Sequence, residues 1–245
     1  MNTIDAILEK QRDWQEIPSG NESFTKAMAL DSLSKCADAL AVLSGNLKAY
    51  GYCWVSFEPI PAHVLKSNIQ TIETKTGLLI PEILAVFWES VGGISFLDLE
   101  DYQHVGFWEE HGVIPPNGFA DGLHVDACSE EWTSSICEDF IDWKEFCAPG
   151  EPECFLFSLA PDGYHKDNIS GGSPYGVFAG SSWKPVWQNF SWSGPMRPAT
   201  ALSDPPDFLS YLRTAILECA GFPALLGDPA FSPIKDNLLL NVPLF

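Results

Sequence analysis

The chain has 245 residues, 33 of them acidic and 13 basic, and its formal net charge is −20. A surface of this charge repels nucleic acid and anionic membranes, so we expect neither as a partner and expect a basic protein instead. Hydrophobic residues make up 46% of the sequence. This content excludes a disordered chain and is sufficient for one large domain, or for one domain with an extension.

The sequence predicts neither a membrane protein nor a metalloprotein. The first residues, MNTIDAILEKQRDW, contain Asp5 and Glu9 and no long apolar run, unlike a signal peptide. No stretch approaches the roughly 20 apolar residues that a membrane-spanning helix needs. The seven cysteines include no C-x-x-C pair. We therefore expect a soluble cytoplasmic protein with reduced cysteines, no zinc and no cofactor.

The first part of the chain is predicted to be helical. Residues 3–15 and 31–44 have helical periodicity, and a strand is predicted for CWVSF at 53–57. A helix is predicted from Pro61 to Lys75. The apolar stripe of the second helix consists of Leu30, Leu33, Ala37, Leu40, Val42 and Leu43.

A helix and a strand follow in PEILAVFWESVGGISFLDL, which covers residues 81–99. Pro81 suits the first turn of the helix, and Gly92 with Gly93 ends it. The segment GISFLDL alternates apolar and polar residues as a strand does.

The second half of the chain is predicted to mix strands with two helices. LHVDAC (123–128), CFLFSLA (154–160) and KPVWQNF (184–190) are predicted strands, and EEWTSSICEDFIDW (130–143) is a predicted helix with an acidic face. Asp204 is expected to cap a last helix that ends at Gly221. One face of that helix carries Phe208, Leu209, Leu212, Ile216 and Cys219. Strands grouped between helices in this way indicate an α+β fold with an antiparallel sheet.

The loop PDGYHKDNISGGSPYG, residues 161–176, combines polar side chains with four glycines and two prolines. It lacks the lysine of a phosphate-binding loop, and the chain has no G-x-S-x-G motif. An enzyme that uses His165, Asp167 and Tyr164 is one interpretation, because a histidine beside a carboxylate can transfer protons. No nucleophile–base pair accompanies these residues, so we predict no catalytic residue.

Four segments resemble the SUKH superfamily, which joins fungal cell-wall-synthesis regulators to bacterial toxin-immunity proteins. They are, in chain order, GLLIPEILAVFWESVGGISFLDL, DGLHV, LAPDGYHKDNISGGSPYGV and FLSYLRTAILECAGFPALL. Together they span about residues 58–228. Gly122 departs from the pattern, since relatives usually have proline there.

The resemblance implies an antiparallel sheet of about four to six strands with helices packed around it. Residues 51–245 would form the SUKH-like domain, and residues 1–50 a helical extension packed on it. The loop 161–176 would then be a structural turn or line a shallow pocket. The residues that would do so are Tyr164, His165, Asn168, Gly171, Gly172 and Tyr175.

The resemblance also implies a non-catalytic binding protein, specifically an immunity protein that neutralises a basic toxin domain, such as a nuclease. The acidic segment 98–153, with fifteen acidic residues and one basic residue, is the expected contact surface. Its interleaved aromatic residues, which include Trp108 and Trp143, are candidate anchors. A regulatory scaffold, a small-ligand module around the loop, and a merely solvated acidic face are the alternatives. The candidate contact residues are Asp98, Glu100, Asp101, Glu109, Glu110, Glu130, Glu131 and Trp132.

Overall fold

The computed structural model describes residues 22–98, 100–101, 103–104, 106–115, 122–146, 155–160, 175–178, 208–225 and 227–245. The predicted helix 3–15, the predicted strand 184–190, the Asp204 cap and the loop up to Pro174 lie outside these residues. Of the helices in the described ranges, none combines the length and the apolar character that crossing a membrane requires.

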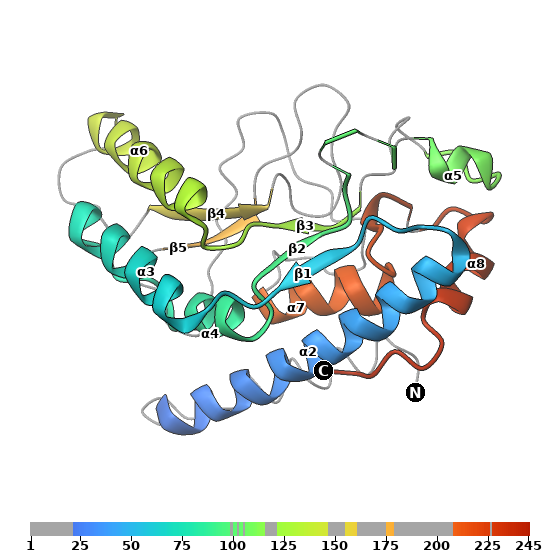
Figure 1. The fold of residues 1–245 in the computed structure, drawn as a ribbon, viewed down its shortest axis with the longest axis horizontal. Helices are drawn as coiled ribbons and strands as arrows, with labels where there is room; N and C mark the ends of the chain where they lie inside the picture. Colours follow the sequence, from blue (N-terminus) through green and yellow to red (C-terminus); the bar gives the residue numbers. More distant parts are fainter. Residues whose placement is uncertain are drawn as a thin grey trace.

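Helices and short strands alternate irregularly along the described chain (Figure 1). The helices are α2 (Glu22–Tyr50), α3 (Ala62–Thr76), α4 (Glu82–Ser90), α5 (Phe107–Glu110), α6 (Glu130–Phe146), α7 (Phe208–Arg213) and α8 (Phe231–Leu238). A π-helix (Thr214–Glu218) continues α7, and a 3-10 turn (Pro223–Leu225) follows it. The strands are β1 (Ser56–Glu58), β2 (Gly93–Ser95), β3 (His124–Val125), β4 (Leu156–Ala160) and β5 (Tyr175–Phe178).

The helices predicted at 31–44, 61–75, 81–91 and 130–143 are confirmed as α2, α3, α4 and α6. The buried face of α2 differs from the predicted stripe, because Leu30 is exposed and Ala37 is only partly buried. The fully buried residues of α2 are Leu33, Cys36, Ala39, Leu40, Leu43 and Leu47. The small side chains of Cys36 and Ala39 thus lie on the face of α2 that packs against α4 and the core.

Gly92 ends α4 as predicted, and the structure shows why glycine is needed there. Its φ is +85°, and a Cβ at this position would lie 1.6 Å from the backbone oxygen of Glu58. The end of α4 therefore passes directly against β1, which only a residue without a side chain permits.

The strands form two antiparallel sheets, which confirms the α+β class. One has the order β1-β2-β3 and the other pairs β4 with β5. Among the described residues this replaces the expected single sheet of four to six strands. The reason is that β3 pairs over only two residues, and its continuation meets β4 through one backbone hydrogen bond, from the Asp126 N–H to the Leu159 oxygen at 2.7 Å.

The described partner of β4 is β5, which begins at the end of the 161–176 loop. Gly176 makes this pairing possible, because a Cβ there would lie 2.4 Å from the backbone oxygen of Phe157. Tyr175, assigned to the loop by the sequence, is the first residue of β5.

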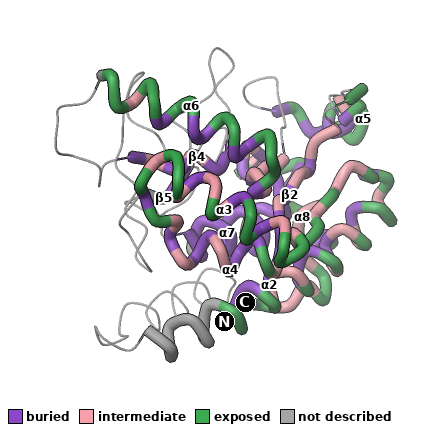
Figure 2. Tube along the Cα trace, turned by 60° about the vertical axis from the view of Figure 1, so that its left-hand side comes forward, coloured by how far each residue is buried: buried purple, intermediate pink, exposed green. Residues whose placement is uncertain are grey.

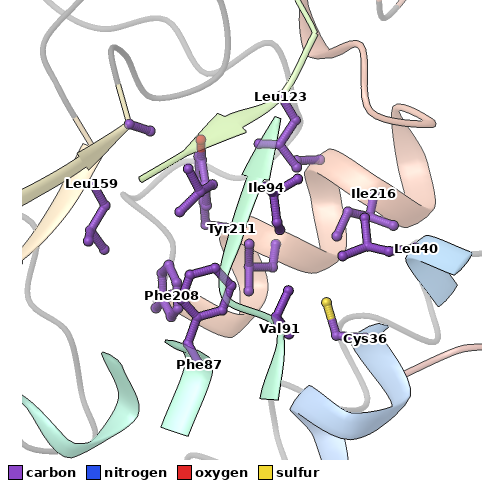
Figure 3. Packing of buried hydrophobic residues seen from close by; sticks show 14 of the residues in the cluster. Cys36, Leu40, Phe87, Val91, Ile94, Leu123, Leu159, Phe208, Tyr211 and Ile216 are labelled. Atoms are coloured by element: carbon purple, nitrogen blue, oxygen red, sulfur yellow. The ribbon is translucent and has the colours of Figure 1, made fainter. Parts of the chain in front are cut away.

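The core lies between the sheets and helices α2, α4 and α7 (Figures 1 and 3). Phe57, Ile94 and Val125 form one cross-strand row of the three-stranded sheet, and Ile94 and Val125 are buried. The apolar face predicted for the last helix is confirmed, since all five of its residues are buried. Their side chains meet those of α2 and α4 in Figure 3, where Phe208 lies against Phe87 and Ile216 near Leu40.

Candidate functional site

Helix α6 is held to the body of the protein by one apolar face. Trp132, Ile136 and Phe140 recur four residues apart and are buried, and the helix packs against α3. The Ser129 hydroxyl accepts the N–H of Trp132 at 3.1 Å at the start of the helix. On α3, the buried Asn68 amide donates to the Cys128 oxygen at 2.7 Å, which ties the segment before α6 in place.

Trp132 was a candidate contact residue, and the structure corrects this assignment. Its side chain is only 7% exposed, its indole N–H donates to the Ser158 oxygen at 3.0 Å, and its ring meets Trp88. Trp132 lies four residues before Ile136 on the same buried face of α6. Because its side chain packs in the core, it cannot also anchor a partner. Trp108 is likewise buried, and Trp143 is partly buried against Phe140.

The opposite face of α6 carries a row of carboxylates. At 100° per residue, Glu131, Glu138, Asp142 and Glu145 lie within an arc of about 60° and extend over about 21 Å of the helix. All four are exposed, and in Figure 2 the α6 tube alternates between buried and exposed colours along its length. We call these four residues the α6 acidic stripe. Glu130 and Asp139 are exposed beside it.

The charges of this helix repel one another. Burial is the largest cause of the raised pKa of the Asp139 carboxyl, and the neighbouring carboxylates of Asp142 and Glu138 raise this pKa further. Within the described part of the chain, no carboxylate of the α6 acidic stripe lies in an ion pair. An apolar side chain, Ile141, adjoins the stripe and is 58% exposed. The face therefore offers unneutralised charge together with one apolar contact.

The remaining acidic candidates do not join this stripe. Glu109 and Glu110 are exposed on α5, and α5 and α6 lie at opposite ends of the molecule in Figure 1. Between them the chain passes through β3 in the sheet. The described acidic residues of segment 98–153 therefore lie in at least two separate regions and not on the one surface that the sequence suggested.

Asp98 has a structural role. Its carboxylate accepts the backbone N–H groups of Glu100, Asp101 and Gln103 at 3.0–3.3 Å. The bonds from Asp101 and Gln103 are the main reason why the pKa of Asp98 lies below its ordinary value. Glu100 and Asp101, also candidates, are exposed in this turn, away from α6.

The signature loop is described only at its end. Tyr164, His165, Asn168, Gly171 and Gly172 lie outside the described residues, and the backbone of Tyr175 belongs to β5.

A second polar cluster, which the sequence did not predict, lies on the three-stranded sheet. His124 is paired with Ser95 across β3 and β2, with 3.2 Å between its Nδ1 and the Ser95 Oγ. Its Nε2 lies 3.3 Å from the Asp126 Oδ1. The alternation in LHVDAC could have placed His124 and Asp126 on one face of a strand, but only the pairing register brings Ser95 to them.

Family models, curated proteins and solved structures were each compared with the chain, and none matches. The α6 acidic stripe consists of carboxylates. Within the described ranges, no group of three or more histidine, cysteine, aspartate or glutamate residues is placed to hold a metal ion. The chemistry that the α6 acidic stripe supports is the attraction of cationic groups.

Proposed function

We propose that the protein acts on its partner by binding rather than by catalysis, and that its α6 acidic stripe docks on a basic protein. The observation that carries the proposal is a row of four exposed carboxylates with no ion pair among them, on a helix whose other face is fixed in the core. A rigid charged face accelerates association with an oppositely charged partner and selects against others.

The energetics of the stripe favour binding over solubility as its role. Dispersed acidic residues are sufficient for solubility, whereas neighbouring carboxylates on one helix destabilise the folded state by repulsion. The raised pKa of Asp139 reflects this repulsion in addition to burial. A cationic partner would relieve it on binding.

The resemblance to SUKH proteins leads us to identify the partner as a toxin domain and the protein as its immunity protein. Residues 51–245 would be the SUKH-like domain, and the protein would work in the cytoplasm without a cofactor. A basic nuclease domain fits this role, because the stripe would occupy the groove in which the nuclease holds a phosphate backbone. The hydrogen bond between Asp126 and Leu159 supports the larger sheet of that family, since it links the two sheets.

The test is capture and neutralisation of a candidate from the adjacent reading frame, provided that its product ends in a basic domain. We expect the tagged domain to co-purify with the wild-type protein and to lose its toxicity when the two are expressed together. The triple variant Glu131→Lys, Glu138→Lys, Asp142→Lys should lose both effects. The matched variant Glu109→Lys, Glu110→Lys on α5 should retain them. Equal protection by both variants would refute the role of α6.

A further inference from the structure

The second polar cluster is built by the sheet itself. Register pairs Ser56 with Ser95 and Ser95 with His124, so these residues form a row across β1, β2 and β3. The flanking row of Ile94 and Val125 is buried, so the polar row lies on the opposite face. Asp126 follows His124 by two residues and shares its side of the strand.

The hydrogen bonds fix the direction of each proton. An ionised carboxylate only accepts, so the bond between Asp126 and the Nε2 of His124 places the imidazole proton on Nε2. Nδ1 then has a free lone pair and accepts the hydroxyl proton of Ser95. The backbone N–H of Leu97 donates to the Ser95 oxygen at 3.2 Å. The Ser95 hydroxyl proton has two acceptors, the His124 Nδ1 at 3.2 Å and the Leu97 oxygen at 3.5 Å, and His124 is the nearer of the two.

The cluster is accessible to small molecules. The side chain of His124 is 22% exposed and that of Asp126 41% exposed, while Ser95 is partly buried between them and Leu97. A hydroxyl, a base with a free lone pair and a carboxylate that orients the base are the groups that activate a serine in a catalytic triad, here with the roles of the two ring nitrogens exchanged.

We propose that Ser95 is a nucleophile activated by His124 as general base, with Asp126 as a positioning residue. The acyl donor would be a small neutral or cationic carboxylic ester, because Asp126 and the exposed Glu58 on the same side of β1 disfavour anions. This reactivity is separate from the binding proposed for α6 and goes beyond it.

The chemical steps are those of acyl transfer. The Ser95 oxygen forms a bond to the carbonyl carbon while its proton passes to Nδ1 of His124. The bond between that carbon and the alcohol oxygen breaks, and the alcohol leaves with the proton. Water then attacks the acyl-serine by the same route and releases the carboxylic acid and free Ser95.

The Leu97 N–H is the one described backbone donor at the nucleophile. This N–H is bound to the nucleophilic oxygen and is not placed for a carbonyl oxyanion. Loss of even one oxyanion donor lowers turnover by about 10²–10³-fold, so we expect slow hydrolysis here. Covalent labelling is therefore a more direct readout than turnover. An alkyl fluorophosphonate forms an oxygen–phosphorus bond to an activated serine and releases fluoride, and the serine proton leaves through the base.

The experiment incubates the full-length protein with the fluorophosphonate and maps the adduct by peptide mass spectrometry. We expect labelling of Ser95, a reduction of about tenfold or more in the labelling rate for His124→Asn and Asp126→Asn, and no adduct at that position in Ser95→Ala. Ser56→Ala is the matched control, because Ser56 lies in the same row and is more exposed but has no histidine opposite it. The Ser56→Ala protein should be labelled at Ser95 as fast as the wild type.

The wild type alone provides a second test, which does not depend on whether a variant folds. Its labelling rate should rise from about pH 5 to about pH 8, as histidine side chains lose their proton and gain the lone pair that a base needs. In Asp126→Asn, both the labelling rate and its dependence on pH should change. An aspartate with a purely structural role would not alter the pH dependence. Absence of a Ser95 adduct, a pH-independent rate, or an unchanged rate in His124→Asn would overturn the proposal.

Discussion

The indole rings of Trp88 and Trp132 meet edge to face between α4 and α6, with 5.0 Å between their centroids. Both indole N–H groups donate hydrogen bonds, that of Trp88 to the backbone oxygen of Asp126 and that of Trp132 to the backbone oxygen of Ser158. One aromatic pair thus joins α4, α6, β4 and the end of β3. The direction in which α6 presents its carboxylates depends on this contact.

Replacement of Trp132 should therefore destabilise the protein as a core mutation does. We expect Trp132→Ala to lower the free energy of unfolding by about 3–5 kcal/mol. Trp132→Phe keeps most of the ring but loses the hydrogen bond to Ser158, and we expect a loss of about 1–3 kcal/mol. Urea unfolding followed by circular dichroism measures both. A change below about 0.5 kcal/mol for the alanine variant, typical of a surface site, would contradict the buried position.

Gly221 and Gly227 have nearly the same φ angle, so their alanine variants separate the cost of backbone strain from the cost of a steric clash. Gly221 has φ +85° and Gly227 has φ +88°. A Cβ on Gly221 would lie 2.0 Å from Phe96 Cε1, whereas one on Gly227 would have no atom within 4 Å. Each alanine substitution should cost about 1–2 kcal/mol of backbone strain. Gly221→Ala should cost about 1–3 kcal/mol more, because the buried Phe96 ring must move. Equal thermal shifts for the two variants would contradict this packing.

The cysteines should differ sharply in reactivity. Burial raises the pKa of Cys128 to about 12 and raises those of Cys36 and Cys219 further, while Cys53 is exposed. Because the thiolate is the reactive form, iodoacetamide should modify Cys53 in the native protein well before these three. All four should react in denaturant. Peptide mass spectrometry identifies each site, and native alkylation of Cys128 or Cys219 at the rate of Cys53 would contradict their burial.

Glu218 should make stability depend on pH. Burial raises the pKa of its carboxyl, and the nearby Lys235 opposes the shift only in part. A carboxyl with a raised folded pKa destabilises the fold above that pKa, and the penalty disappears as pH falls below its unfolded value. At pH 7 we therefore expect Glu218→Gln to raise Tm by about 1–2 °C, a modest amount because the group is only half-buried.

Thermal unfolding at two pH values tests this expectation. The gain from Glu218→Gln should be much smaller near pH 4, where most of the Glu218 carboxyl is protonated in both states. Glu89→Gln, at an exposed position of α4, is the control and should leave Tm almost unchanged at both values. A gain that is larger at pH 4 than at pH 7 would contradict the assigned shift.

Helices were predictable from the sequence because their signals are local. Pro81 and Gly92 mark the two ends of α4, and the spacing of Trp132, Ile136 and Phe140 defines the buried face of α6. The same spacing could have shown that Trp132 belongs to the core. The acidic stripe could equally have been found from the positions on the opposite face, since it needs only the helical period.

The positions of β1, β2, β3 and β4 follow strands predicted from the sequence, whereas their pairing was less predictable, because it joins residues that are far apart in sequence. β5 begins directly after Pro174 and contains Gly176, and both residue types normally argue against a strand. Here Gly176 is required by the close approach to β4. The contact between Ser95 and His124 likewise depends on register, which no local pattern reveals.

The central claim, that the α6 acidic stripe is the partner-binding face, is tested most directly by association kinetics against the basic domain that the capture experiment identifies. Stopped-flow measurements at low and physiological salt should show that Glu131→Lys, Glu138→Lys, Asp142→Lys together slow association by about tenfold or more and reduce its salt dependence. Glu109→Lys, Glu110→Lys on α5 should associate at nearly the wild-type rate. An association rate and salt dependence that are unchanged by the α6 reversals would contradict the claim.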